Sequence, residues 1–251
     1  MIARRAALAT LACVATAACS TTTPDRAVAA GAVPASAERA APRGEWELVY
    51  DQDFRSEAAL ADFAFTDANA WRWSDAGGHP SLELVGGSRY APPHRSPLNI
   101  ALARELELGD FALEVDLLQT GREYGHRDLC LFFGYTSPAH FYYVHLATTP
   151  DDHANNIFVV NGAPRVRAAQ VPAQGVEWGE GSWHTVRLER SLASGTIRVF
   201  FDDMETPVLE TKDATHAWGR IGFGSFDDSG RFARVRVWAP EVRVASGVAF
   251  E

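Results

Sequence analysis

Apolar and polar residues alternate along most of the sequence between Glu45 and Pro240. A period of two places successive side chains on opposite faces of a strand, so this alternation predicts sheets with one buried face. In Phe111–Leu117 every second residue is apolar, and Glu114 and Asp116 lie between them. A series of such segments without alternating helices predicts an all-β domain and excludes doubly wound folds.

The turns between these segments are short and rich in Gly, Pro and Asp, as in the hairpin loop Ser191–Gly195. Many short strands joined in this way predict a two-sheet antiparallel jelly-roll sandwich. The one convincing helical stretch is Glu57–Ala64. The predicted strands are Trp46–Phe54, Trp71–Trp73, Leu82–Val85, Leu98–Leu106, Phe111–Leu117, Leu129–Tyr135, Phe141–Ala147, Asn156–Asn161, His184–Arg190, Thr196–Phe201, Arg220–Phe226 and Phe232–Trp238.

Residues 1–18 have the features of a signal peptide. A basic start precedes an apolar stretch, Ala6–Ala18, that is too short to span a bilayer. The small residues before Cys19 resemble a lipobox, although Thr16 stands where Leu is usual. We therefore expect export and a lipidated Cys19, with lipidation of Cys13 or simple secretion as alternatives. The expected location is the bacterial cell envelope, as a periplasmic or outer-membrane lipoprotein.

Residues 19–44 are rich in Ala, Thr, Ser and Pro and show no sustained periodicity. Such a segment buries too little apolar surface to offset its ordering entropy, so we expect a flexible tether. The predicted domain is 45–240, a length of about 200 residues that suits one sandwich, and 241–251 forms a C-terminal tail. With Cys19 lipidated, Cys130 is the remaining thiol of the mature chain, and its apolar surroundings predict that it is buried.

The formal net charge of −9 at pH 7 disfavours nucleic-acid backbones and anionic lipid surfaces as partners. The expected membrane contact is therefore the N-terminal lipid alone. We expect a monomer that binds no nucleic acid.

Several segments resemble strands of concanavalin A-like (laminin G-like) jelly rolls: Trp46–Phe54, Gly109–Asp116, Trp183–Arg190 followed by Gly195–Asp203, and Gly219–Phe226 followed by Arg234–Trp238. Within that superfamily the chain resembles the bacterial 3-keto-disaccharide hydrolase domains, also described as 3-keto-glucoside 1,2-lyase/hydratase domains. The resemblance covers Glu45–Pro240. It implies a carbohydrate-active enzyme, a lyase or hydrolase of 3-keto-glycosides or related disaccharides, but its motifs encode strands and turns and transfer no catalytic residue.

A second motif, Glu114–Gln119, resembles the E-x-D-x-x-E strand of laminarinase-like glycoside hydrolases. A retaining glycosidase needs two carboxyl groups about 5–5.5 Å apart. Here Gln119 occupies the acid/base position, and an amide cannot donate a proton as a carboxylic acid does. We therefore reject this mechanism and keep Glu114 and Asp116 as groove-lining candidates, because they share the polar face of the strand.

The block Arg122–Arg165 is rich in aromatic residues and holds four of the eight histidines, His126, His140, His145 and His153. Strand parity in Phe141–Ala147 directs Tyr142, Val144 and Leu146 toward the core and leaves Phe141, Tyr143 and His145 on the opposite face. Consecutive strands are usually neighbours. We therefore expect Arg127, Tyr143, His145 and His153 to converge, together with Asn155 or Asn156.

Such a group suits a 3-keto sugar, whose ketone acidifies the proton on C2. We assign His145 as the base, Tyr143 as the proton donor and Arg127 as the stabiliser of enolate charge. The predicted substrate-binding residues are His126, His153, Asn155, Asn156, Glu114, Asp116 and Trp71.

Each assignment has a structural alternative, since a strand histidine or a turn aspartate commonly serves folding alone. Structural calcium is a further possibility, at Asp151–Asn156 or at a cluster of Asp51, Asp53, Asp227 and Asp228; no other cofactor is indicated. The alternative function is a non-catalytic glycan-binding module, with Trp71, Trp73, Tyr143 and Trp178 as stacking platforms. We favour the enzyme, because a solitary exported binding module without appended domains is unusual.

Overall fold

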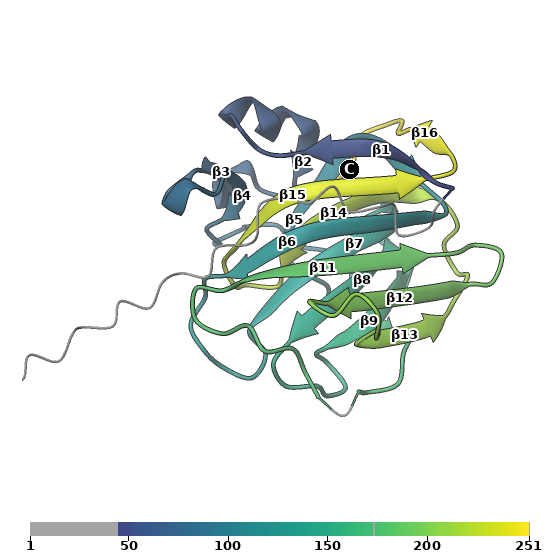
Figure 1. Cartoon of the computed structure of the whole chain (residues 1–251). Coiled ribbons are helices and arrows are strands. Elements are labelled where there is room, and N and C mark those ends of the chain that lie inside the picture. The colour runs from purple at the N-terminus through teal and green to yellow at the C-terminus, as the bar shows by residue number, and fades with distance from the viewer. Residues whose placement is uncertain (1–44, 173, 251) are drawn as a thin grey trace, which may run out of the picture.

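The computed structural model describes residues 45–172 and 174–250. In this part of the chain the strands form two eight-stranded antiparallel sheets that pack face to face (Figure 1). The fold is therefore an all-β jelly-roll sandwich, as the alternation predicts. The expected signal peptide, Cys19 and tether lie outside the described residues. Within those residues, no helix is long and apolar enough to span a bilayer.

Sheet A is the front layer in Figure 1. Its neighbouring strands are mostly distant in sequence, as the long crossovers of a jelly roll require. In order across the sheet they are β13 (Leu209–Lys212), β12 (Thr196–Phe201), β11 (Trp183–Arg190), β6 (Phe111–Gln119), β15 (Gly230–Ala239), β4 (Ser81–Leu84) and β3 (Trp71–Ser74), and β1 (Glu47–Gln52) also pairs with β15.

Sheet B lies behind sheet A in Figure 1 and carries the candidate site. Its three consecutive strands β7, β8 and β9 are direct neighbours, as expected for the Arg122–Arg165 block. In order across the sheet the strands are β10 (Val166–Arg167), β9 (Asn156–Asn161), β8 (His140–Ala147), β7 (Asp128–Ser137), β14 (Gly219–Ser225), β5 (Asn99–Leu108) and β16 (Val242–Val244), and β2 (Phe63–Phe65) pairs with β5.

The core fills the space between the two sheets. Leu113, Val115 and Leu117 of β6 are fully buried there. Tyr142 and Val144 belong to the same cluster, together with Leu146. Strand parity therefore predicted the inward face of β8 correctly, because a pleated strand holds its alternation along its whole length.

The short elements lie at the edges of the sheets. The helical stretch expected over Glu57–Ala64 is a 3₁₀ helix, η1 (Glu57–Asp62), and two further 3₁₀ turns are η2 (Ala68–Ala70) and η3 (Ala76–Gly78). Four short strands, β2, β10, β13 and β16, were not predicted. These strands have two to four residues, a length at which a period of two is a weak signal.

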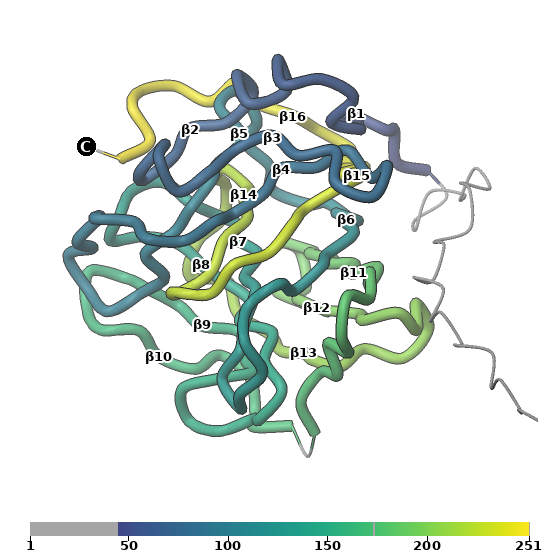
Figure 2. Tube along the Cα trace, turned by 90° about the vertical axis from the view of Figure 1, so that its left-hand side faces the viewer, coloured from purple at the N-terminus to yellow at the C-terminus, as the bar shows by residue number. Residues whose placement is uncertain are grey.

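Sheet B also has a buried outer face. Cys130, Phe132 and Tyr143 lie in a second apolar cluster on this face, and Ala249 belongs to it. The ring of Phe250 packs edge-on against Tyr135 at 5.8 Å between centroids, and Figure 2 shows the C-terminal segment on the sheet B side of the sandwich. The domain boundary expected at Pro240 is therefore too early, because β16 and the residues after it complete the fold.

Candidate functional site

A pocket of about 430 Å³ opens on sheet B where β7 begins and β8 ends. In the register of these strands, Cys130 of β7 lies opposite His145 of β8. Residues directly opposite each other share a face, so Asp128, two residues before Cys130, lies on the same side. The side chains that carry chemistry in the pocket wall are Arg95, Tyr124, His126, Asp128, His145, His153, Arg165 and Asp227.

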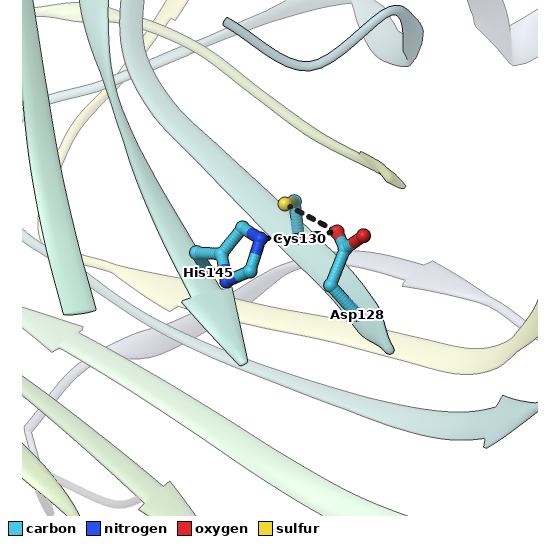
Figure 3. Close-up of side chains that lie close together, drawn as sticks. All are labelled: Asp128, Cys130 and His145. Carbon is cyan, nitrogen blue, oxygen red and sulfur yellow. Dashed lines mark hydrogen bonds and ion pairs between the residues drawn. The ribbon is translucent and has the colours of Figure 1, made fainter. Parts of the chain in front are cut away.

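Asp128, Cys130 and His145 lie close together (Figure 3), and the first and last of them line this pocket. Nε2 of His145 lies 3.8 Å from Oδ2 of Asp128, and both side chains are buried. The Cys130 thiol donates a hydrogen bond to the same carboxylate oxygen over 3.1 Å. The burial predicted for Cys130 is confirmed, and its neighbour is an acid that itself has almost no contact with solvent.

The hydrogen bond that Nδ1 of His145 accepts determines which ring nitrogen carries the proton. The backbone N–H of Asn155 donates to Nδ1 over 3.2 Å, so Nδ1 is an acceptor and the neutral ring carries its proton on Nε2. Burial, with the charges of Arg165 and His126, lowers the pKa of His145 to about 3. At neutral pH the ring is uncharged and its one lone pair is occupied. This geometry does not support His145 as the catalytic base.

Asp128 is part of a buried pair of acids. Burial raises the pKa of Asp128 to about 8, and the nearby Asp228 carboxylate adds to the rise. Burial also raises the pKa of Asp228, whose Oδ2 accepts hydrogen bonds from the Tyr124 hydroxyl over 2.8 Å and from the Asp128 amide over 2.9 Å. Burial and the neighbouring carboxylate therefore favour the protonated form of Asp128.

Two groups of potential metal ligands occur among the described residues, Asp128 with Cys130 and His145, and Asp128 with Asp227 and Asp228. The first group does not suit a metal, because Nε2 of His145 keeps its proton while Asn155 occupies Nδ1. In the second group, oxygens of both buried acids already accept hydrogen bonds from protein donors.

The calcium cluster expected from Asp51, Asp53, Asp227 and Asp228 is not formed among the described residues. Asp53 instead pairs with Arg55 over 2.8 Å. Asp51 lies on β1 of sheet A, whereas Asp227 follows β14 of sheet B. In the other expected loop, Asp151 binds His126 and the backbone N–H of His153.

His126 and Asp151 form a hydrogen-bonded dyad at the pocket. Nε2 of His126 lies 2.6 Å from Oδ2 of Asp151, and about half of the imidazole, 49%, is exposed. A carboxylate only accepts, so Nε2 carries a proton and Nδ1 of the neutral ring holds the lone pair. The backbone N–H of His153 donates to Oδ1 of Asp151 over 2.7 Å and orients the acid. This dyad has the arrangement that a general base requires.

Arg165 supplies a cation to the same pocket. Its guanidinium lies 4.4 Å from the ring centre of Phe158 and 4.7 Å from that of Phe226. It donates hydrogen bonds to the Tyr143 hydroxyl and, over 3.0 Å, to the carbonyl of His153. The aromatic rings and the two hydrogen bonds fix the orientation of the planar group.

Tyr143 and His145 share the outer face of sheet B, as strand parity predicts. The Tyr143 side chain is fully buried, however, and its hydroxyl bonds to Arg165. Burial raises the pKa of this phenol well above its ordinary value. Tyr143 therefore positions Arg165 and is a poor proton donor for a substrate.

The placement expected for Arg127 is wrong. Its guanidinium donates to the carbonyl of Gly179 over 3.0 Å and lines a separate cavity of about 750 Å³, beside Trp178. Arg127 precedes β7, where the pleat no longer fixes the direction of a side chain. Arg165 takes the position in the pocket that was assigned to Arg127.

Asn155 and Asn156 support the loop instead of facing the pocket. The Asn155 side chain accepts from the Ala147 amide over 3.1 Å and donates to the Gln174 carbonyl over 3.3 Å. The Asn156 side chain accepts from the Ala169 amide over 3.2 Å and donates to the carbonyl of Gln170 over 3.1 Å. Both are buried, so their expected role in substrate binding is replaced by a structural one.

Glu114 and Asp116 lie on sheet A, away from the pocket. Glu114 accepts a hydrogen bond from Arg236 over 3.0 Å, and Asp116 pairs with Arg234. Neither lines the pocket, and both are satisfied by neighbouring strands. Gln119 has the opposite parity and donates to the backbone carbonyl of Asp128 over 2.9 Å. The groove expected from these two acids is therefore not part of this site.

Trp71 is a core residue. Its ring packs against Phe65 at 5.6 Å and Phe232 at 5.8 Å between centroids, and 6% of the residue is exposed. Trp178 is also buried, and its indole N–H donates to the Arg127 carbonyl. A ring enclosed by protein cannot stack on a sugar, so neither tryptophan is a stacking platform.

Of the predicted site residues, the structure brings His126, His145 and His153 into one pocket. Asp128 and Arg165 belong to the same block of sequence but received no role, and Asp151 was considered only as a turn residue or a calcium ligand. Their roles in the site depend on burial and on hydrogen bonds, which the spacing of residues in the sequence does not show. The acidic partner of His126 lies 25 residues away.

Comparisons with known proteins bear on the fold. No family model and no curated protein matches the sequence. A Bacillus subtilis protein of unknown function with a galectin-like fold gives a TM-score of 0.55 at 13% identity, over 79% of this chain and 99% of that one. The fold is concanavalin A-like.

Two further structures agree with this assignment. The GH43 protein BlXynB from Bacillus licheniformis gives a TM-score of 0.54 at 13% identity, over 79% of this chain and 40% of that one. The β-glucanase of Bacillus licheniformis gives 0.51 at 12% identity, over 76% of this chain and 98% of that one. At such identities the likeness shows the shared fold alone.

Proposed function

We propose that this domain is a carbohydrate-cleaving enzyme, a lyase or hydrolase of 3-keto-glycosides or related disaccharides, with the sheet B pocket as its active site. One observation carries the proposal: His126, which is hydrogen-bonded to Asp151, lines one pocket together with Asp128, whose protonated form burial favours, and the Arg165 cation. Two of the structural neighbours are named as a GH43 protein and a β-glucanase, which supports a carbohydrate as substrate.

The residues of the pocket suit an elimination. Nδ1 of His126 removes the proton on C2, which the adjacent ketone acidifies, and Asp151 stabilises the resulting imidazolium. The positive potential of the two guanidinium groups in the pocket wall, Arg95 and Arg165, stabilises the negative charge that develops on the ketone oxygen. The bond between C1 and the glycosidic oxygen then breaks, and Asp128 donates a proton to that oxygen. Water adds to the unsaturated 3-keto sugar in a second step.

One observation favours a non-catalytic glycan-binding module as the second candidate. The oxygens of Asp128 accept hydrogen bonds from the Ser225 hydroxyl over 2.9 Å and from the Phe226 amide over 3.2 Å, besides the Cys130 thiol. An acid enclosed in this way commonly has a structural role. The pocket would then bind a sugar without breaking it.

The deciding experiment incubates the purified protein with native and 3-keto disaccharides, with and without a chelator, and follows products by mass spectrometry. We expect cleavage of the 3-keto substrate, and a loss of about 10²-fold or more in His126→Ala. His140→Ala is the matched control, because His140 is exposed at the other end of β8 and does not line the pocket. Saturable glycan binding without turnover would establish the binding module instead.

We also propose that the protein is exported, with lipid on Cys19 holding a monomeric domain at the cell envelope. The basic and apolar start of the sequence and its small residues before Cys19 support this. Metabolic labelling with palmitate tests the proposal, and the label should disappear in Cys19→Ala.

A further inference from the structure

Arg165 is held in place without a counter-ion. Among the described residues, its hydrogen-bond acceptors are the Tyr143 hydroxyl and the His153 carbonyl, and neither is charged. Its guanidinium lies over the rings of Phe158 and Phe226 at the pocket wall. Phe158 is itself buried, so this platform is rigid. A partly buried guanidinium retains unused N–H donors, which favour an anion supplied from outside the chain.

Other arginines of the sandwich show the contrast. Arg234 and Arg236 pair with Asp116 and Glu114 on sheet A. Arg167, two residues after Arg165, pairs with Asp152 over 3.1 Å. The chain thus neutralises these three cations within the fold. Arg127 and Arg220 resemble Arg165 in binding carbonyl oxygens, but they line other cavities.

The charge of the pocket wall differs from that of the whole protein. The chain carries a formal net charge of −9, yet Arg95 and Arg165 both line this pocket. Two acids also line the wall: Asp128, whose protonated form burial favours, and Asp227, which is exposed to solvent. The pocket therefore offers two guanidinium groups to a ligand of an otherwise acidic protein.

The size and walls of the pocket indicate what carries the anion. Its volume of about 430 Å³ far exceeds that of an inorganic anion and falls in the range of small-ligand sites. Pro92, Leu98 and Phe226 add apolar surface beside the cations. A sugar ring presents apolar C–H faces, and a carboxylate matches the planar fork of a guanidinium with two parallel hydrogen bonds.

From these observations we infer that the ligand of the pocket is an acidic sugar, a hexuronic acid unit whose carboxylate pairs with Arg165. The inference rests on the proposed function, because it assigns a chemical class to the sugar that the pocket binds. Arg165 then sets specificity for the acidic sugar, and Arg95 adds long-range attraction at the rim.

The test is calorimetric titration of the full protein with digalacturonate, with the neutral galactobiose and with inorganic sulfate. We expect digalacturonate to bind at least about tenfold more tightly than galactobiose, because the guanidinium–carboxylate pair is lost with the neutral sugar. The affinity for digalacturonate should fall as salt rises, since salt screens the charges of a pocket open to solvent. Sulfate alone should bind weakly.

Three variants assign the effect to Arg165. Arg165→Gln should lose about tenfold or more in affinity for digalacturonate while its affinity for galactobiose changes little. The affinity of Arg165→Lys for digalacturonate should lie between those of the wild type and Arg165→Gln, because an ammonium keeps the charge but not the planar fork. Arg167→Gln is the matched control, because Arg167 lies nearby on β10 but does not line the pocket. Thermal unfolding of each variant shows whether it folds. If Arg165→Gln does not fold, the affinity of Arg165→Lys decides the test.

Equal affinity for the acidic and neutral disaccharides, or no effect of either Arg165 substitution, would overturn the inference. Sulfate binding as tight as digalacturonate would also overturn it, since the site would then recognise any small anion. Turnover of a neutral 3-keto disaccharide without preference for uronates would support the proposed enzyme and contradict the inference of an acidic sugar. Tight uronate binding through Arg165 without turnover would support the acidic sugar and contradict the proposed enzyme.

Discussion

The backbone N–H of Asn155 donates a hydrogen bond to Nδ1 of His145 over 3.2 Å and thereby fixes the tautomer of a buried imidazole. Asn155 has a positive φ of 48°, and its side chain bonds to Ala147 and Gln174. The loop that delivers this N–H is therefore tied down from both sides. His145 forms part of the base of the pocket, while the exposed His126 keeps the free lone pair.

Substitution of the two histidines should separate these roles. His126→Ala should reduce turnover by about 10²-fold with little change in stability, because its ring is half exposed. His145→Ala should lower the free energy of unfolding by about 2–4 kcal/mol, because it opens a cavity beside Phe158 and Phe226. Turnover of folded protein and urea unfolding measure the two effects, and the reverse pattern would restore His145 as the base.

Strand parity predicted the parts of the site that lie within long strands. Tyr143 pairs with Phe132, and His145 with Cys130, so both side chains project from the outer face as expected. The period of two is a property of the pleated backbone, which acts along the whole strand. For the same reason the inward face of β8 was predictable, whereas the burial of Cys130 on the outer face was predicted from its apolar neighbours in the sequence.

The rest of the site depends on contacts that no local pattern contains. Arg127 lies just before a strand and turns toward the Gly179 carbonyl, whereas Arg165 enters the pocket after the turn at Gly162, where φ is +67°. The burial of Trp71 depends on Phe232, a residue far along the chain. The direction of a side chain at the end of a strand, and its burial by distant segments, depend on tertiary contacts. The alternation of apolar and polar residues does not specify these contacts.

Asp128 should make the protein less stable as the pH rises. Its pKa is about 8 in the folded state and about 3.8 in the unfolded chain, so the unfolded state binds fewer protons in between. Its stabilising contribution is present below pH 4 and is lost as the pH rises through 8. As the pH rises from 6 to 8, the free energy of unfolding of Asp128→Asn should therefore increase by about 1–3 kcal/mol relative to that of the wild type. Chemical unfolding at each pH measures this difference. A constant difference across this range would contradict a protonated Asp128.

His184, on sheet A, should also make the protein less stable as the pH rises. Burial disfavours its charged form, but hydrogen bonds from Nδ1 to Asp202 and from Nε2 to the Trp178 carbonyl, each 2.8 Å long, outweigh this and raise the pKa of His184. Two acceptors require both nitrogens to carry protons. The stabilisation is present below the ordinary value of 6.5 and is lost as the pH rises through the raised pKa.

His184→Phe should keep the ring stacked on Phe201, since the present centroid distance is 4.6 Å, but should remove this pH dependence. Melting temperatures from pH 5 to 9 test the effect. Identical slopes for His184→Phe and the wild type would show that the ring is neutral throughout.

Trp71→Ala should lower the free energy of unfolding by about 3–5 kcal/mol, because the ring fills the core between Phe65 and Phe232. Val244→Ala is the control for an exposed apolar residue, since Val244 is 80% exposed, and should change stability by about 0.5 kcal/mol or less. Glycan affinity of the folded Trp71→Ala protein should stay unchanged. A stable variant that no longer binds glycan would show instead that Trp71 is a stacking surface.

Deletion of residues 241–251, the segment that the sequence predicts to be a C-terminal tail, should destabilise the domain. The deletion removes β16 from its pairing with β5, and it takes Phe250 from the rings of Tyr90 and Tyr135. Loss of this cover exposes the apolar outer face of sheet B, so we expect about 2–4 kcal/mol lower stability in urea unfolding. Phe250→Ala should give part of the loss, and Val248→Ala, at a residue 67% exposed, almost none. Unchanged stability of the truncated protein would return the domain boundary to Pro240.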